Sequence, residues 1–190
     1  MNLLESVFQE ELLREEHILW KGKPNPKVFT RSDIVMIPIS LLWSSVVLFV
    51  GMFAFFSGSL ILIAFGVFFV FMASYFIIGR ILYRWWKRKN TYYAVTNKRV
   101  LVLTDLWNKN LHTAYINAIP VINRSIRSDD SGSITFGNTS FWASVNESTG
   151  MDFFGPSYGK EAPTFHDIKD AAGVYEIVTE LRRRIQKDLE

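Results

Sequence analysis

One uninterrupted apolar segment dominates the hydrophobic pattern of this chain. Residues 34–79 contain no Asp, Glu, Lys, Arg or His. A helix needs about 20 apolar residues to cross a bilayer, so this segment is long enough for two crossings. Ser57-Gly58-Ser59 is a turn signal near its middle. The pattern predicts a transmembrane helical hairpin with spans at 34–56 and 60–79. A buried core helix of a soluble protein is the alternative, but such helices show a polar stripe and these segments show none.

The residues on either side of the hairpin predict shorter elements. In residues 1–33, apolar positions between glutamates predict an amphipathic helix over Leu3–Leu13, and His17–Trp20 predicts a short strand that a Gly/Pro turn ends. Residues 80–190 show period-two patterning followed by a three- and four-residue apolar spacing that predicts a final helix from near Asp167–Asp170, with Asp170 as its N-cap. Strands are predicted at Tyr93–Leu103 (with a turn at Thr96–Lys98), Leu111–Tyr115, Ile119–Ile126, Ser133–Gly137 and Ser140–Val145, before a long loop over 146–163.

These elements predict an α+β protein with three parts. They are an N-terminal helix and first strand (1–33), the membrane hairpin (34–79), and a domain of residues 80–190. The last part is long enough for a core of its own. Strands followed by one closing helix, in about 100 residues, predict a small antiparallel β-barrel or sandwich that the C-terminal helix closes.

The excess positive charge of the chain lies beside the second span. Residues 1–33 and residues 90–190 each carry a net charge of −1, whereas residues 80–89 carry +5. Cations therefore flank the hairpin on both sides of an uncharged loop, and the positive-inside rule predicts a multi-pass protein with both termini in the cytoplasm. The basic segment admits two roles that can hold together: it sets topology, or it binds anionic headgroups at about 1 kcal/mol per cation. Its candidate residues are Arg80, Arg84, Trp85, Trp86, Lys87, Arg88 and Lys89, the tryptophans acting as an interfacial anchor.

Composition and motifs argue against several other classes of protein. A nucleic-acid-binding domain would carry a basic face on its soluble part. The net charge of −1 on residues 90–190 argues against such a face. The chain has no cysteine, and its three histidines lie far apart without ligand spacing. No zinc-protease, serine-hydrolase or phosphate-loop motif is present. We therefore expect no catalytic residue, no cofactor and no metal.

Several motifs resemble, in the right order, those of bacterial pleckstrin-homology domains. The stretch Tyr93–Leu101 is similar to the family signature Y-x-(V/L)-T-N-x-R-(V/I), in which Tyr93, Thr96, Asn97 and Arg99 match. Members often have Gly-Glu before the first strand, where this chain has Glu15-Glu16. Further similarity lies in Leu19–Pro24, Ile119–Ile126 with Gly132–Gly137, Pro163–Ala171 with Val174-Tyr175, and, for membrane-bound members with a two-helix hairpin, Asp33 with Ile37–Trp43.

The resemblance implies a fold and leaves the activity open. At the signature turn, a structural role for Arg99 is favoured over a headgroup or partner contact. We expect a non-enzymatic module, anchored in the bacterial inner membrane, that organises a protein partner or copies of itself at the cytoplasmic face. The alternative is a domain that senses anionic lipid.

Overall fold

The computed structural model describes residues 8–25, 31–139, 149 and 162–187. The chain divides into two compact units. We call residues 27–86 with 141–158 the helical unit, and residues 1–26, 87–140 and 159–190 the β-unit. Along the sequence, the helical unit therefore interrupts the β-unit twice.

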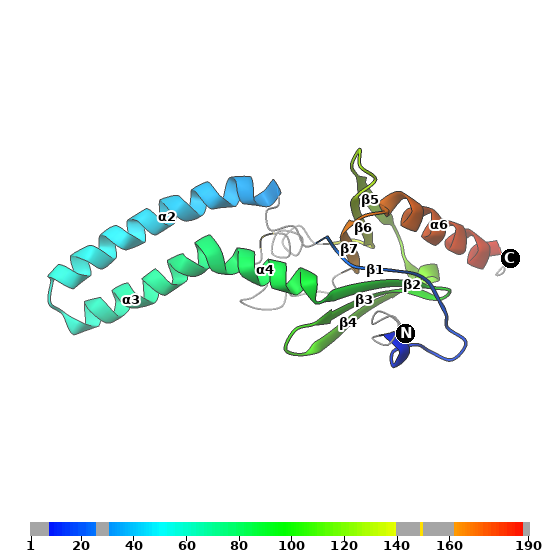
Figure 1. Cartoon of the computed structure of the whole chain (residues 1–190), viewed down its shortest axis with the longest axis horizontal. Coiled ribbons are helices and arrows are strands. Elements are labelled where there is room, and N and C mark those ends of the chain that lie inside the picture. The colour runs from blue at the N-terminus through cyan, green and yellow to red at the C-terminus, as the bar shows by residue number, and fades with distance from the viewer. Residues whose placement is uncertain (1–7, 26–30, 140–148, 150–161, 188–190) are drawn as a thin grey trace. The chain divides into compact units, whose positions relative to one another are not determined.

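The helical unit is a hairpin of two long helices (Figure 1). The first is α2 (Arg31–Phe56). The second is continuous through α3 (Leu60–Ser74), a π-helical segment η1 (Tyr75–Gly79) and α4 (Arg80–Lys89). Gly58 lies in the connecting turn with a φ of 66°, a left-handed conformation that glycine adopts without strain. The second helix continues ten residues past the predicted end of its span at Gly79, because the basic residues that follow are good helix formers.

Small residues bring the two helices together near the middle of the hairpin. A Cβ placed on Gly66 would lie 3.5 Å from the Cα of Gly51 and 3.7 Å from the Cβ of Ala54. Such close approach of backbones is typical of helix packing in lipid. Large apolar side chains elsewhere on the hairpin are exposed, including Phe53 at 70% and Leu60 at 83%. Both helices, Asp33–Phe56 and Leu60–Lys89, are long and apolar enough to cross a membrane.

Two antiparallel sheets form the described part of the β-unit. Sheet A has the order β1-β2-β3-β4, and sheet B has the order β5-β6-β7. β1 pairs with β2 although the whole helical hairpin separates them in sequence; Gly22 lies opposite Tyr93. The strands are β1 (Ile18–Gly22), β2 (Thr91–Thr96), β3 (Arg99–Asp105), β4 (Lys109–Tyr115), β5 (Ile122–Ile126), β6 (Gly132–Phe136) and β7 (Thr164–Ile168).

The C-terminal helix α6 (Ala171–Lys187) packs onto the core between the sheets. Asp170 is its N-cap, as predicted, since a carboxylate oxygen accepts the backbone N–H of Gly173 at 3.0 Å. One face of sheet A, sheet B and α6 together bury the main core. The other face of sheet A buries a smaller cluster that includes Phe8. The main core contains Tyr93, Val95, Val100, Val102, Ile119, Ile134, Phe136, Phe165, Ile168, Ala171, Val174 and Val178.

The α+β class is confirmed, and the details of the strands differ from the prediction. Of the predicted barrel or sandwich, the barrel is wrong: the described strands form two sheets that are not closed into one. The predicted strand Ile119–Ile126 begins only at Ile122, since the short 3-10 helix η2 (Ile116–Ala118) and Pro120 come first, and proline cannot donate to a ladder. β7 was not predicted as a strand. The predicted strand Ser140–Val145, most of the loop 146–163 and most of the helix Leu3–Leu13 lie outside the described residues.

A disulfide can test the packing of the two long helices. The chain has no cysteine, so an introduced pair is the only one present. The 3.7 Å between the Cβ positions of residues 54 and 66 lies within the range of disulfides. We expect Ala54→Cys with Gly66→Cys to form an intrachain disulfide on mild oxidation, seen as a mobility shift in a non-reducing gel. Ala54→Cys with Val67→Cys is the matched control, because Val67 is half exposed. Equal oxidation of both pairs would contradict the packing.

Candidate functional site

The first charged cluster lies between the two helices of the hairpin, at the end away from the connecting turn. Asp33, in the first turn of α2, is only 2% exposed. Its carboxylate lies 3.6 Å from the Arg80 guanidinium and 2.5 Å from that of Arg84. Both arginines are also buried. Removing one partner of a buried ion pair leaves an uncompensated charge, so this cluster holds the open end of the hairpin.

The π-helical segment η1 determines how Arg80 is placed. The backbone N–H of Arg80 bonds to the Tyr75 carbonyl, five residues earlier, and its side-chain Nε donates to the Phe76 carbonyl at 2.8 Å. Gly79 is required here, because a Cβ at this position would lie 2.6 Å from the Tyr75 ring. A π-turn changes the angular position of every residue that follows it on the helix. Sequence periodicity alone therefore could not predict which face Arg80 and Arg84 occupy.

The structure divides the predicted basic segment into two groups. Arg80 and Arg84 contact Asp33 inside the helical unit. Lys87, Arg88 and Lys89 form the last turn of α4, where cations complement the negative end of a helix dipole. Lys89 is exposed, and Lys87 and Arg88 are half-buried. Of the two predicted interfacial tryptophans, Trp86 is 37% exposed and Trp85 is half-buried.

Asp167 is the second buried acidic centre and belongs to the β-unit. Its carboxylate accepts hydrogen bonds from Arg88 at 3.0 Å and from Arg127 at 2.7 Å. Its backbone N–H donates to Ser133 Oγ, and its carbonyl accepts the N–H of Asn25. The φ of Asp167 is 46°, a left-handed conformation that is uncommon for a residue other than glycine. Asp167 therefore ties the last turn of α4 to β6 and to the segment after β1. Sequence reasoning missed it, because nothing local marks it out.

The predicted signature turn is a buried polar network between β2 and β3. Thr96 Oγ1 donates to a Glu16 carboxylate oxygen at 2.7 Å and accepts the backbone N–H of Arg99 at 3.0 Å. Arg99 also donates hydrogen bonds to the Glu16 carboxylate, from Nε at 2.9 Å and from a terminal nitrogen at 3.0 Å. Asn97 bonds the backbone of the Glu15–His17 segment. The Arg99 guanidinium is thus buried against Glu16, and its role in this geometry is structural.

Glu15 directly precedes the carboxylate of this network, and Tyr93 is the signature residue that lies in the main core. Glu15 has a φ of 63°, at the position where the family resemblance expects glycine. A left-handed conformation costs a residue with a Cβ roughly 1 kcal/mol or more. The following residue, Glu16, is the carboxylate that Arg99 and Thr96 bind. Tyr93 lies in the main core, where its ring stacks on Phe165 with centroids 4.6 Å apart and its hydroxyl accepts the N–H of His166.

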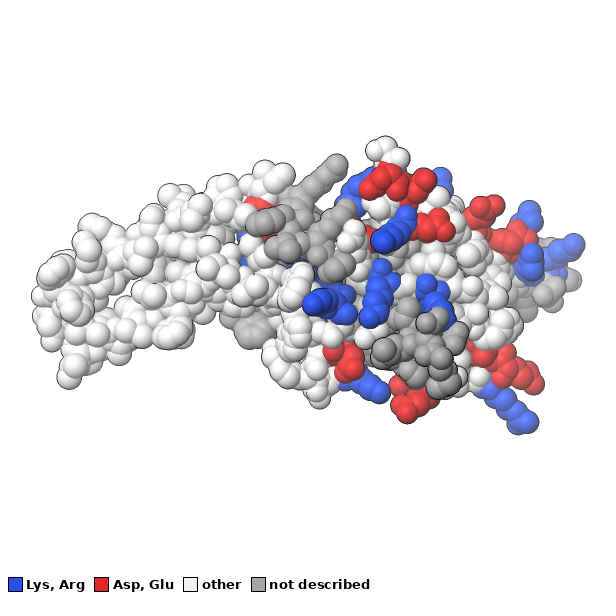
Figure 2. Space-filling view, in the orientation of Figure 1, with Lys and Arg blue, Asp and Glu red and all other residues white. Residues whose placement is uncertain are grey.

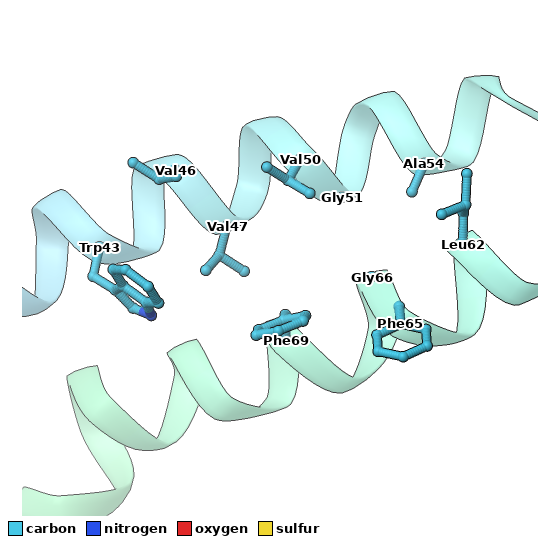
Figure 3. Close-up of a pocket in the computed structure, with 10 residues that line it drawn as sticks. All are labelled: Trp43, Val46, Val47, Val50, Gly51, Ala54, Leu62, Phe65, Gly66 and Phe69. Carbon is cyan, nitrogen blue, oxygen red and sulfur yellow. The ribbon is translucent and has the colours of Figure 1, made fainter.

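An apolar groove lies between α2 and α3 of the hairpin. Its volume is about 340 Å³, and all ten residues that line it are apolar. Figure 3 shows Trp43, Val47 and Phe69 directed into the space between the helices, with Gly51, Ala54 and Gly66 along the rest of the seam. Apart from the indole nitrogen of Trp43, the lining side chains carry no polar group that could orient a polar ligand or carry out chemistry. Within the described residues, no group of three or more His, Cys, Asp or Glu could hold a metal ion.

Comparisons with protein-family models, with curated proteins and with solved structures find no match to this chain. The candidate sites therefore depend on the geometry described above.

The Glu16 network predicts a loss of stability in acid. Burial raises the pKa of the Glu16 carboxyl, but hydrogen bonds from Arg99, the Leu13 N–H and Thr96, with the charge of Arg99, outweigh burial and set the pKa below its ordinary value of 4.5. The folded state therefore binds its proton less readily than the unfolded state. The stabilisation is full above pH 4.5 and is lost as the pH falls through the lower, folded-state pKa.

We expect Glu16→Gln to destabilise the β-unit by about 2 to 4 kcal/mol at neutral pH, because it leaves Arg99 buried without its carboxylate. The variant should also lose part of the acid dependence that the wild type shows in urea unfolding, measured in mild detergent across this pH range. Glu180→Gln is the control: hydrogen bonding to Arg184 is the largest cause of the lowered pKa of Glu180, but this pair is exposed and solvent screens it. An unchanged acid dependence in Glu16→Gln would contradict the assignment.

Proposed function

We propose that this chain is a non-enzymatic, membrane-anchored interaction module. In this proposal the helical unit crosses the bacterial inner membrane as a two-span hairpin. The β-unit and both termini lie in the cytoplasm, where the β-unit binds a protein partner or a second copy of the chain. Membership of the bacterial pleckstrin-homology-like family is part of the proposal. Its support is the succession of antiparallel strands and one closing C-terminal helix, together with three signature residues, Thr96, Asn97 and Arg99, that all bond to the Glu15–His17 segment.

The observation that carries the anchoring is the pairing of β1 with β2. Because Gly22 and Tyr93 are partners in one sheet, the chain between them leaves the β-unit and returns to it. If this segment enters a bilayer, it must cross an even number of times, and two helices are long enough to do so. Figure 2 shows the helical unit white along almost its whole visible length, without Lys, Arg, Asp or Glu. The positive-inside rule then favours the cytoplasm for the β-unit.

The edge strand β4 supports a protein-binding role for the β-unit. β4 is the last strand of sheet A, and Asn110, His112 and Thr113 on it are exposed. An edge strand offers backbone N–H and C=O groups that a strand from another chain can pair with. A second function, the sensing of anionic lipid, is favoured by Lys89 and Trp86 at the end of α4, which are both exposed.

Reporter fusions test the anchoring. We expect a reporter that is active only outside the cytoplasm to be silent when fused after Glu190 and active when inserted at Gly58, where the structure leaves open space. The chain should stay in the membrane fraction after alkaline carbonate extraction, since two apolar spans hold it there. A reporter that is active after Glu190 and silent at Gly58 would show that the topology is the reverse of the proposed one. Release by carbonate would overturn the anchoring altogether.

Photo-crosslinking tests the role of β4. We expect a photoreactive amino acid at His112 to give a discrete crosslinked product in cells, either to one protein or to a second copy. The same amino acid at Thr179, an exposed position on α6, is the matched control and should give none. Products of equal yield from both positions, or from neither, would count against docking on this strand.

A further inference from the structure

The strand register gathers three separate segments at one end of sheet A. Thr91, the first residue of β2, lies opposite Thr104, near the end of β3. Asp105 lies opposite Lys109, so residues 106–108 form the turn from β3 to β4 at this same end (Figure 1). Gly22, the last residue of β1, is also here, opposite Tyr93. The Asp105 N–H donates to the Asn90 carbonyl at 2.9 Å, which joins the turn directly to the end of α4.

The tip of the β3–β4 turn carries an exposed tryptophan. Trp107 is 70% exposed, more than any other large apolar side chain in the described part of the β-unit; the next, Tyr115, is 47% exposed. Tryptophan is enriched where an apolar ring meets headgroups and water. Trp107 therefore presents a large apolar surface at this end of the sheet.

Several cations lie at the same end of the sheet as Trp107. Lys89 ends α4 next to Asn90, Lys109 follows the turn, and Lys23 follows β1 with its ammonium group 4.1 Å from the centre of the Tyr92 ring. Lys109 lies 3.8 Å from Glu10, with both side chains largely exposed. Lys87 and Arg88 add two more cations, and Arg88 is paired with Asp167. Asp105 is the last residue of β3, directly before the turn. Among these described residues, five cations thus face three carboxylates.

We infer that this end of sheet A, with Trp107 at its tip, is a contact site for an anionic bilayer surface. The inference rests on the proposed membrane anchoring and deepens it. Along the chain this end is the part of the β-unit nearest the second span: Lys89 follows Gly79, the last residue of the uncharged segment, by ten helical residues, or about 15 Å. Trp107 enters the interface, and Lys23, Lys89 and Lys109 meet headgroup phosphates. The contact lays the β-unit on the membrane and leaves the exposed edge strand β4 for a partner.

Site-specific fluorescence tests this contact without altering Trp107. Because the chain has no cysteine, Asn108→Cys takes an environment-sensitive dye beside the tryptophan. The labelled full-length protein is reconstituted into vesicles of neutral phosphatidylcholine, or of phosphatidylcholine with phosphatidylglycerol. We expect blue-shifted emission and loss of acrylamide quenching in the anionic vesicles. Both should weaken when salt is raised from about 0.1 M to about 1 M, which shortens the Debye length from about 10 Å to about 3 Å.

Two variants and one control position make the test specific. Trp107→Ser should remove the blue shift in anionic vesicles, and Lys89→Gln with Lys109→Gln should remove its salt dependence. A dye at Ser128, in the exposed acidic turn between β5 and β6, should stay equally quenched in both vesicles. If the protein resists carbonate extraction but position 108 is quenched alike in both lipids, this inference fails while the anchoring stands. The inference would also be overturned if protection of the dye at position 108 from acrylamide rose with the protein-to-lipid ratio and did not depend on lipid charge. The turn would then be a contact between copies of the chain.

Discussion

The pairing of β1 with β2 is the constraint on which the rest of this structure depends. These strands are hydrogen-bonded neighbours, yet the entire apolar segment of the chain lies between them. Closing a loop of this length costs only a few kcal/mol in chain entropy, because the cost grows with the logarithm of length. The hairpin itself brings the ends of that loop together, through close contact at Gly51, Ala54 and Gly66 and through the ion pairs of Asp33. The proposed two-span topology agrees with this pairing, since a chain that crosses a bilayer and returns to the same sheet crosses it an even number of times.

Buried carboxylates hold the segments that enter and leave the hairpin. Asp33 binds Arg80 and Arg84 within the helical unit, and Asp167 binds Arg88 and Arg127 within the β-unit. Each acid thus pairs with at least one cation of the basic segment, for which the sequence predicted a role in topology or in headgroup binding. Burying charges is costly unless they are paired, so these arginines act first as structural residues. The proposed lipid contact then depends on the lysines and on two exposed tryptophans, Trp86 and Trp107.

The signature turn shows how a sequence motif can mark a structural network. Thr96 and Arg99 both bind Glu16, which lies far away in the sequence but next to the turn in the sheet. Glu15, with its left-handed backbone, places Glu16 where both can reach it. The buried guanidinium of Arg99 therefore leaves little for a ligand to contact at this turn. The exposed end of the same sheet, at the β3–β4 turn, offers a more accessible surface.

Sequence alone determined those features whose signals are local or periodic. The apolar run, the glycine turn at Gly58, the α+β class and the C-terminal helix capped by Asp170 are encoded by neighbouring residues, so composition and spacing predict them. Only the tertiary structure decided which cations are buried, because the π-turn before Arg80 rotates the helix and because Asp167 reaches its partners across the fold. It also decided that the sheets stay open, that β7 is a strand, and that Asp105, before the β3–β4 turn, bonds to Asn90 at the end of α4. These features depend on pairings between residues far apart in the sequence, and no local pattern carries that information.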